Sequence, residues 1–427
     1  MSEPGATALA ELSGSLDAAL GGALPGRIGV AVSGGGDSVA LVLLMQRWAG
    51  PRGVQLDAAT VDHGLRPESA AEAARAGELC ARLGIGHSVL RWQGWDGSGN
   101  LQDTAREARR RLLADWAGAA GIAHVALGHT RDDQAETVLM RLARGSGVEG
   151  LAGMAPVRRG RGITWLRPML GIDRATLRDF LRTEGQPWAD DPSNTDMRFD
   201  RVRARQALAV LAGLGIDAAG LADTAQAMES ARVALAHAAS DLAGHLRIDA
   251  TGDLRIARAP FQAAPADTRE RLAAHLLRLL SGAVHRPRRA ALRKLLDAVS
   301  QGGSGTLHGC VVAAEEGDAG PCLRFGREWQ AVRGLAGEPG GIWDGRWRVS
   351  PATGLSAAGL HVAALGPAGL GQCAGWPATG LSRAGLMAAP ALWRGETLVA
   401  APLARPGDPA RAHLLWGEDI VAHTLLH

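Results

Sequence analysis

Residues 33–38 read Ser33-Gly34-Gly35-Gly36-Asp37-Ser38 and connect the apolar run Arg27–Val32 to a second apolar stretch, Val39–Arg47. The short run before the glycines predicts a buried strand, and the stretch after them predicts a helix. Glycines let the backbone approach a polyphosphate closely, and the N–H groups at a helix N-terminus bind anions. The sequence therefore predicts a strand–loop–helix unit that binds the phosphates of a nucleotide.

Side chains of the same loop supply further groups for ATP. Ser33 and Ser38 provide hydroxyl donors, and Asp37 provides a carboxylate for the Mg²⁺ that accompanies ATP. Two commoner nucleotide motifs are excluded: the Walker A motif needs a loop lysine, whereas the single lysine is Lys294, and a Rossmann loop needs glycine where Val39 stands. The structural alternative is a glycine-rich turn in which Ser38 caps the helix.

Short apolar runs alternate with helical patterns through the first half of the chain. Further strands are expected at Gln55–Val61, His87–Trp92 and His124–Gly128. Helices are expected at Ser69–Leu83, Leu101–Ala119 and Asp133–Arg144. Strands that alternate with helices are typical of βαβ units, so we expect an α/β fold with a doubly wound, mostly parallel sheet in a first domain, residues 1–215.

The second half of the chain has a different character. Residues 216–300 are rich in Ala, Leu and Arg. This composition predicts a small, mainly helical domain, residues 216–330, which ends in a hairpin through Leu307–Val312 and Cys322–Phe325. Residues 331–427 are rich in Gly and Pro, with strand-like segments at Trp343–Val349, His361–Ala364 and Thr397–Ala400. We expect a β-rich third domain there.

Composition excludes several classes of protein. The 427-residue chain is 46% hydrophobic and 21% charged, with a net charge of +3, so it is not disordered throughout. Its four cysteines form no CxxC pair, which argues against a disulfide scaffold or a zinc ribbon. No apolar run approaches the ~20 residues of a membrane span, and no secretory signal is visible, so we expect a cytoplasmic protein without membrane contact. With one lysine and no tyrosine, the many arginines reflect compositional bias and do not alone indicate function.

An acidic cluster follows the fourth expected strand, at the edge where open α/β sheets bind ligands. His129 precedes Asp132, Asp133 and Glu136, and a helix would place Glu136 on one face with either aspartate. Such a cluster suits a cationic amino acid, Mg²⁺ or removal of a proton from an amine, and His129 suits proton exchange or binding of phosphate charge. The structural alternatives are a capping box of Asp133 with Glu136 and a histidine satisfied by the backbone.

Arginines cluster in two places downstream. Arg201, Arg203 and Arg205 alternate, so on an extended segment they would share one face and follow a phosphate backbone, whereas a helix would spread them. Arg288 and Arg289 belong to a second basic group, in the expected helical domain. We expect these five arginines to contact RNA, and a generic basic surface is the alternative.

The phosphate loop, together with the stretches Val61–Ser69, Gly128–Thr137 and Asp190–Asn194, resembles the tRNA(Ile)-lysidine synthases, a family of PP-loop ATP pyrophosphatases. The resemblance extends over residues 27–206. It implies that ATP adenylates the C2 oxygen of the wobble cytidine in a CAU-anticodon tRNA(Ile), and that free lysine then displaces AMP to form lysidine. It also implies catalytic roles for Asp37, His129 and Asp133, lysine binding by the acidic cluster, and tRNA recognition by the C-terminal regions.

The resemblance further places the arginines of the expected helix Leu101–Ala119 close to the nucleotide. Arg109 is then the candidate that stabilises charge on the adenylated intermediate, and a solvated helix face is the alternative. Two positions depart from the family pattern. Arg110 stands where a tyrosine is usual, and Val202 stands where an asparagine is common.

Three other functions fit the sequence less well than lysidine synthesis. A tRNA thiolase of the same superfamily needs paired cysteines, and Cys80 is the one cysteine of the catalytic half. A glutamine-dependent amidotransferase needs a nucleophilic cysteine in a glutaminase domain, and an RNA-binding protein on a decayed fold would not need the intact loop. The sequence determines neither the general base, nor how tRNA(Ile) is distinguished from tRNA(Met), nor whether the enzyme forms a homodimer.

Overall fold

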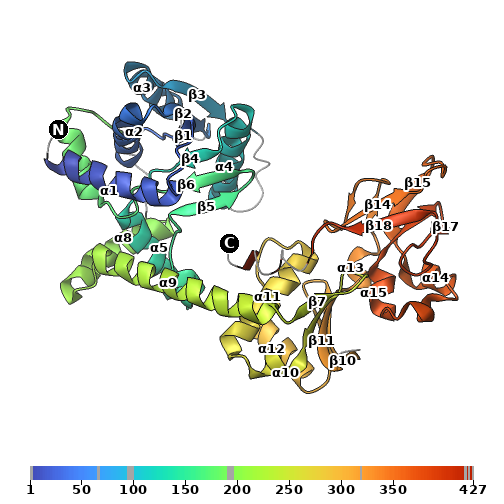
Figure 1. Cartoon of the computed structure of the whole chain (residues 1–427). Coiled ribbons are helices and arrows are strands. Elements are labelled where there is room, and N and C mark those ends of the chain that lie inside the picture. The colour runs from blue at the N-terminus through green and yellow to red at the C-terminus, as the bar shows by residue number, and fades with distance from the viewer. Residues whose placement is uncertain are drawn as a thin grey trace. The chain divides into compact units, whose positions relative to one another are not determined.

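The computed structural model describes residues 3–64, 68–93, 101–189, 197–317 and 320–417, together with residues 421 and 424–425 (Figure 1). Contacts within the chain divide it into two compact units, Met1–Arg232 and Val233–His427. The long helix α9, Ala218–Ala243, carries the chain from the first unit into the second.

A six-stranded sheet with the order β3-β2-β1-β4-β6-β5 forms the centre of the first unit. Its strands are β1 Arg27–Ala31, β2 Gln55–Asp62, β3 Gly86–Arg91, β4 His124–Ala126, β5 Val157–Gly160 and β6 Ile163–Leu166. Neighbouring strands pair in parallel except for β5, which runs antiparallel to β6 at the edge. The expected α/β fold with a mostly parallel sheet is therefore confirmed.

Helices cover both faces of this sheet (Figure 1). The helices of this unit that precede α9 are α1 Glu3–Leu20, α2 Gly36–Ala49, α3 Glu68–Arg82, α4 Leu101–Ala119, α5 Arg131–Ala143, α6 Val148–Leu151, α7 Arg174–Thr183 and α8 Asp200–Leu211. Residues of α1, α2, α3 and α7 pack on one face, around Trp48 and Phe180. Leu113 and Ala117 of α4 pack on the other face. Burial on both faces accounts for the nearly continuous apolar sequence of β1.

The strand order reverses at β1, which lies between β2 and β4. Because β1 and β4 are parallel, the loops that follow them begin at the same edge of the sheet. This is the switch point at which open α/β sheets bind ligands. The phosphate loop follows β1 and His129 follows β4, so the topology brings two distant sequence motifs together.

Several elements of the first unit are not predicted by the sequence patterns: α1, the β5–β6 hairpin, α7 and α8. In α1 the buried positions Ala8, Leu12 and Leu16 do have helical spacing, but Gly, Ala and Ser dilute the apolar signal. β5 and β6 have four residues each, which is too short for a period-two pattern to stand out.

The second unit contains a five-stranded sheet with the order β7-β8-β11-β10-β9. Its strands are β7 Leu246–Ile248, β8 Leu254–Ala257, β9 Ser304–Leu307, β10 Cys310–Gly317 and β11 Gly320–Arg327, and its helices are α10 Arg258–Ala263, α11 Ala266–Ser281 and α12 Arg289–Ser300. The expected hairpin is present, since Val312 pairs with Phe325. The segment that was expected to be helical thus also supplies β7 and β8, in which Leu246, Leu254 and Ile256 are buried in the core.

The remainder of the second unit is built mainly from short strands, as expected. A four-stranded sheet has the order β12-β15-β16-β17 and a three-stranded sheet the order β13-β14-β18. Their strands are β12 Ala336–Gly337, β13 Ile342–Trp343, β14 Trp347–Pro351, β15 Leu360–Ala364, β16 Pro390–Arg394, β17 Thr397–Ala400 and β18 Ala410–Leu414, accompanied by the short helices α13 Trp329–Val332, α14 Gly366–Gly371 and α15 Arg383–Ala388.

All four cysteines are buried free thiols. Within the described ranges, no individual helix has the length and apolar character of a membrane span. The pair Asp200–Leu214 and Ala218–Ala243 meets that test jointly, with a bend of 100° between its two parts.

Candidate active site

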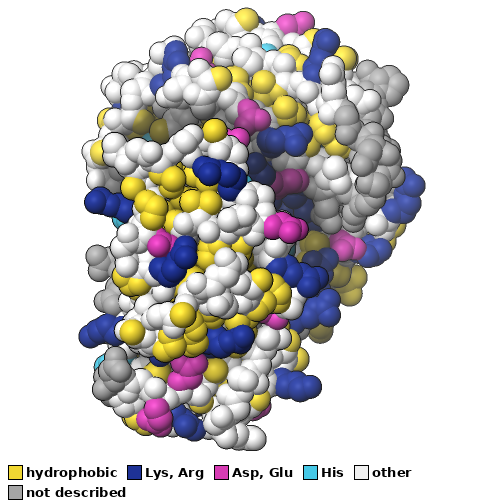
Figure 2. Space-filling view, turned by 90° about the vertical axis from the view of Figure 1, so that its right-hand side faces the viewer, with side chains coloured by type: hydrophobic (Ala, Val, Ile, Leu, Met, Phe, Trp, Pro, Cys, Tyr) yellow, Lys and Arg dark blue, Asp and Glu magenta, His cyan; other side chains and the backbone are white. Residues whose placement is uncertain are grey.

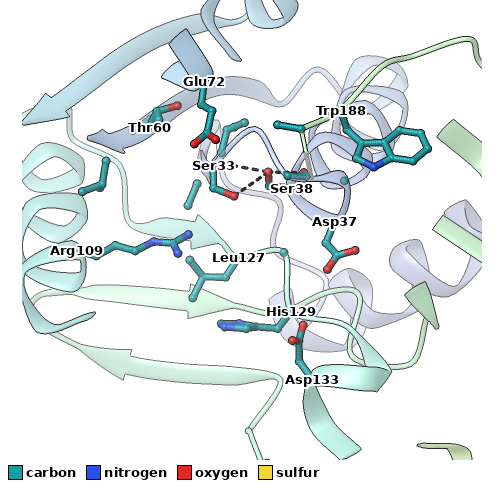
Figure 3. A pocket seen from close by; sticks show the side chains of 18 of the residues that line it. Ser33, Asp37, Ser38, Thr60, Glu72, Arg109, Leu127, His129, Asp133 and Trp188 are labelled. Carbon is teal, nitrogen blue, oxygen red and sulfur yellow. Dashed lines mark hydrogen bonds between the residues drawn. The ribbon is translucent and has the colours of Figure 1, made fainter. Parts of the chain in front are cut away.

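A cavity of about 980 Å³ opens at the carboxyl edge of the six-stranded sheet. Its walls come from the ends of β1, β2 and β4 and from α4, α5, α7 and α8. Figure 3 shows Ser33, Ser38 and Asp37 on one side, Arg109 across from them, and His129 beside Asp133. The phosphate loop, His129, Asp133 and Arg109 therefore share one cavity, although they come from three separate parts of the sequence.

Hydrogen bonds inside the phosphate loop fix its shape. Ser38 Oγ donates to the Gly35 carbonyl at 2.8 Å and accepts from the Ser33 N–H at 3.1 Å. Gly34 has a φ of +84°, which glycine alone adopts without strain. The structural alternative for Ser38 is wrong, because Gly35 holds the N-cap position and α2 begins at Gly36. The first N–H groups of α2 therefore border the cavity and are available to an anion.

The segment before residue 190 supports the phosphate loop. Gly35 forms a β-bridge with Ala189, whose N–H donates to the Gly34 carbonyl at 3.1 Å. The ring of Trp188 lies so close that a Cβ at Gly36 would be 3.3 Å from Trp188 Cδ1. The motif that follows, residues 190–194, lies outside the described residues, as do residues 65–67 of the earlier stretch 61–69. Sequence reasoning missed Trp188, which directly precedes a motif that it did identify.

A capping box at the start of α5 fixes Asp133. The Thr130 N–H donates to Asp133 Oδ2 at 2.9 Å, and the Asp133 N–H donates to Thr130 Oγ1 at 3.3 Å. The capping box is thus real, but its partner is Thr130 and not Glu136. Burial raises the pKa of Asp133, but the Arg174 cation and the Thr130 N–H outweigh it and bring the pKa below its ordinary value. Asp133 is therefore a carboxylate at neutral pH.

Arg174, the first residue of α7, is a site residue that the sequence motifs do not indicate. Its Nε donates to Asp37 Oδ2 and its Nη2 to Asp133 Oδ1, both at 3.1 Å, while Nη1 lies 3.6 Å from Glu136 Oε1. Burial lowers the pKa of Arg174, but the surrounding carboxylates raise it above its ordinary value. One guanidinium therefore joins the phosphate loop to the acidic cluster. The available signal was Asp173, the residue that caps α7 after the last strand of the sheet.

Asp132 and Glu136 are not among the residues that line the cavity. Asp132 Oδ2 accepts the N–H of Arg174 at 2.8 Å, so this carboxylate holds the start of α7. Glu136 is only 1% exposed, and its Oε1 accepts from Arg205 Nε at 2.8 Å. Its Oε2 is buried without a hydrogen-bond partner in the described part of the chain. Glu136 thus retains an unused acceptor, whereas Asp132 is engaged with the backbone.

His129 and Arg109 have pKa values that burial shifts downward. Burial lowers the pKa of His129 to about 3, with Asp133 opposing the shift, so the imidazole is neutral near pH 7. Burial also lowers the pKa of Arg109, assisted by Arg201 and Arg106. Arginine nevertheless remains protonated at physiological pH. The cavity therefore contains a neutral imidazole and, at Arg109, a guanidinium whose charged neighbours among the described residues are the arginines Arg201 and Arg106.

Arg201, Arg203 and Arg205 lie on α8, so the extended-segment alternative is wrong. Arg201 and Arg205 are one turn apart, and both line the cavity. Arg201 Nη1 lies 4.0 Å from Asp133 Oδ1. Arg203 is exposed and pairs with Asp200 on its own helix. The helical period therefore places two of the three arginines beside the acidic cluster and turns the third away.

Arg288 and Arg289 belong to the second unit. Arg288 is exposed at the N-cap position of α12, and Arg289 Nε donates to Glu270 Oε2 at 2.8 Å. Figure 2 shows Lys and Arg side chains spread over one face of the molecule, with Asp and Glu side chains among them. The basic residues on that face do not merge into a single uniform patch.

Known proteins resemble this chain over most of its length. A family model described as a PP-loop domain matches residues 10–211. The tRNA(Ile)-lysidine synthase of Ruegeria pomeroyi is 48% identical and covers 94% of this chain and 95% of that protein. The tRNA(Ile)-lysidine synthase of Hyphomonas neptunium is 42% identical and covers 70% of this chain and 83% of that protein. A solved structure, the U34-tRNA thiolase of Methanococcus maripaludis, aligns with a TM-score of 0.45 at 17% identity, over 52% of this chain and 79% of that one.

Proposed function

This chain belongs to the tRNA(Ile)-lysidine synthase family, and from that premise we propose that its cavity brings together ATP, lysine and the wobble cytidine of tRNA(Ile). The enzyme is an ATP-dependent carbon–nitrogen ligase. The C2 oxygen of cytidine attacks the α-phosphorus of ATP and pyrophosphate leaves. An amine of lysine then attacks C2, AMP leaves with that oxygen, and lysidine is formed. The observation that carries the assignment is the meeting of the phosphate loop with an acidic cluster at one sheet edge.

The phosphate loop is the nucleotide half of the site. The N–H groups at the start of α2 bind the phosphates of ATP. The hydroxyls of Ser33 and Ser38 join them by turning from their bonds within the loop, in which Ser33 Oγ donates to Ser38 Oγ and Ser38 Oγ to the Gly35 carbonyl. Asp37 suits Mg²⁺, because its partly exposed carboxylate lies beside the place of the phosphates, and Mg²⁺ is usually held by one or two carboxylates and substrate phosphates. When bound, Mg²⁺ would neutralise charge on the departing pyrophosphate. The hydrogen bond from Arg174 orients the Asp37 carboxylate.

The acidic cluster is the lysine half of the site. Asp133 presents a carboxylate to the cavity, and Glu136 has a buried oxygen that lacks a hydrogen-bond partner in the described chain. A lysine ammonium would supply a donor for that oxygen. Asp132 was expected to join this group, but its bond to the Arg174 N–H leaves it a supporting role. We therefore assign the direct lysine contact to Asp133. Contact with Glu136 requires the bound ammonium to reach past the residues that line the cavity.

His129 and Arg109 complete the reaction centre. The neutral imidazole of His129 has a free ring nitrogen lone pair, which can accept a hydrogen bond from the attacking amine. Arg109, which faces the loop across the cavity, is placed to stabilise negative charge on the adenylated cytidine. Arg201 helps to lower the pKa of Asp133, and we expect Arg201 and Arg205, which both line the cavity, to meet the RNA as it enters.

The remaining proposals concern partners and location. Arg203 on α8 and Arg288 and Arg289 on the second unit are proposed to contact tRNA, and the second unit supplies the recognition of tRNA(Ile). We expect the reaction in the cytoplasm, where ATP, lysine and tRNA are all present. Light scattering on the purified enzyme distinguishes a monomer from a homodimer.

The test is incorporation of labelled lysine into CAU-anticodon tRNA(Ile) in the presence of ATP and Mg²⁺. We expect ATP-dependent incorporation by the wild type and a loss on the order of 100-fold or more for Asp37→Ala, which removes a group that acts on transition-state charge. Asp115→Ala is the matched control, because Asp115 is an exposed carboxylate on α4 outside the cavity. Absence of incorporation by a protein that binds both ATP and tRNA would contradict the assignment and favour another PP-loop modification, such as thiolation.

A further inference from the structure

Four arginines come from α4 and from the β5–β6 hairpin and its end. Of these, only Arg109 has a role in the site described above. Arg109 and Arg110 are on the first half of α4, and Arg158 is on β5 directly opposite Trp165 of β6. Trp165 packs in the same apolar cluster as Leu113 of α4, so Arg158 also projects from the sheet face that α4 covers.

Arg167 lies on the same face. It follows Trp165 by two residues, and its N–H donates to the Pro156 carbonyl, which continues the β5–β6 ladder. Its position is diagonal to Arg158, a separation of about 7–8 Å between neighbours of this kind in an antiparallel pair. The two arginines therefore stand together beside α4. We call Arg109, Arg110, Arg158 and Arg167 the arginine cluster.

Arg167 is buried without a counter-charge. It is 8% exposed, and Nη1 donates to the Ala155 carbonyl at 2.6 Å. Its Nε is buried and has no hydrogen-bond partner in the described part of the chain. Burial, together with Arg158 and Arg110, lowers the pKa of Arg167 to about 10, so it is still charged at neutral pH.

Carboxylates of the described residues compensate little of the positive charge of the arginine cluster. Glu107 is the one nearby carboxylate that pairs with it within the described residues, at 3.8 Å from Arg110 Nη1, and Glu107 also pairs with Arg161 of the hairpin turn. A buried cation without an anion is costly, and such groups are normally paired. The arrangement is therefore suited to an anionic ligand.

The position of the arginine cluster identifies the anion. ATP phosphates belong at the loop, across the cavity from Arg109. Arg109 lines the cavity, whereas Arg110, Arg158 and Arg167 do not, so the anion lies beside the reaction centre and outside the nucleotide site. We propose that the arginine cluster binds the phosphate backbone of the anticodon loop next to the cytidine that enters the cavity. This inference rests on the proposed function, because it takes tRNA as the substrate.

The test measures the affinity for tRNA(Ile) as a function of salt for the double variant Arg110→Ala/Arg158→Ala. Both residues are exposed, so their removal should leave the fold intact. We expect binding weaker by on the order of tenfold and a salt slope lower by about 1.4, because each single-strand phosphate contact contributes about 0.7. The loss should be equal for tRNA(Ile) and an unrelated tRNA, since phosphate contacts carry no sequence information. Binding of an ATP analogue should not change.

Arg182→Ala is the matched control, because Arg182 is an exposed arginine at the far end of α7, on the opposite face of the sheet. Arg167→Met tests the buried member, with circular dichroism as a check on folding. A double variant with wild-type affinity and salt slope would overturn the inference, as would a loss of ATP binding with tRNA binding intact. If the wild type binds tRNA but incorporates no lysine, the proposed function is wrong. The salt dependence of tRNA binding still tests the arginine cluster in that case.

Discussion

At the scale of single residues, the site depends on how charges compensate each other. The carboxylates of Asp37, Asp133 and Glu136 repel one another at close range, and the guanidinium of Arg174 contacts all three. Burial raises the pKa of Asp37 above its ordinary value, and Arg174 limits that rise. Arg174 is thus a positioning residue whose cation favours the ionised forms of Asp37 and Asp133.

Arg174→Met should shift the acid limb of the pH profile of kcat/KM for lysine incorporation to higher pH. Without the cation, the pKa of Asp37 rises further above its ordinary value and that of Asp133 rises from below it. Both groups must be ionised to act, so activity at the acid end of the profile falls more than activity at the alkaline end. Stability should fall as well, because breaking a buried pair on one side costs about 3–5 kcal/mol.

Arg47→Met is the control for this prediction. Arg47 also forms an ion pair, with Glu184, and its side chain is 27% exposed, but it does not line the cavity. Its loss should lower stability without moving the pH profile. A pH profile of Arg174→Met that superimposes on the wild type would show that Arg174 does not control ionisation in the site.

Residue types and their spacing in the sequence predict many residues of the site, but not the ion pairs that join them. Asp37, His129, Asp133 and Arg109 lie in recognisable motifs, and the structure places all four around one cavity. Arg174 belongs to no such motif. Its role arises because α7 begins at the same sheet edge as the phosphate loop, a fact of tertiary topology that short-range patterns do not contain.

At the scale of elements, the strand–loop–helix unit depends on backbone shape as much as on side chains. Gly34 adopts a φ of +84° and passes close to α3, where a Cβ would lie 3.5 Å from the Glu72 carbonyl. Trp188 closes the other side of the loop against Gly36. The loop is therefore held in one conformation before ATP arrives, which lowers the ordering cost of binding.

Gly34→Ala should raise the KM for ATP and destabilise the protein. A residue with a Cβ in the left-handed region costs roughly 1–2 kcal/mol, and the loop would relax away from the phosphate-binding shape. Gly53→Ala is the matched control, because Gly53 has a φ of +66° with nothing within 4 Å of its Cβ position and lies outside the cavity. We expect both variants to lose stability equally. Only Gly34→Ala should change the KM for ATP. Equal effects on the KM would show that the loop conformation does not matter for ATP.

The same scale shows where sequence patterns are ambiguous. The strands β1 and β2 and the helices α2, α4 and α5 are predicted within a few residues, because long apolar periodicities specify them. The segment of Arg201, Arg203 and Arg205 fits an extended chain or a helix equally well by charge alone. Packing decides it, since Val202 and Ala204 are buried when the segment is helical and Arg205 then reaches Glu136.

At the scale of the whole molecule, the chain has two units with separate apolar cores. The cores of Met1–Arg232 surround the six-stranded sheet, and those of Val233–His427 surround three smaller sheets. The cavity at the phosphate loop is lined entirely by residues of the first unit. Composition alone does not locate the boundary between Arg232 and Val233, because it falls within the continuous helix α9.

Calorimetry should therefore resolve two unfolding transitions, of which a non-hydrolysable ATP analogue with Mg²⁺ raises only one. A ligand at 100 times its Kd stabilises the unit that binds it by about 2.7 kcal/mol, which corresponds to roughly 5–10 °C for a unit of this size. Hydrogen exchange should show increased protection confined to the first unit. Asp37→Ala should abolish the shift and leave the other transition unchanged. A single transition that moves as a whole would mean that the two units unfold cooperatively, so that ATP binding is felt through α9 by the region proposed to recognise tRNA.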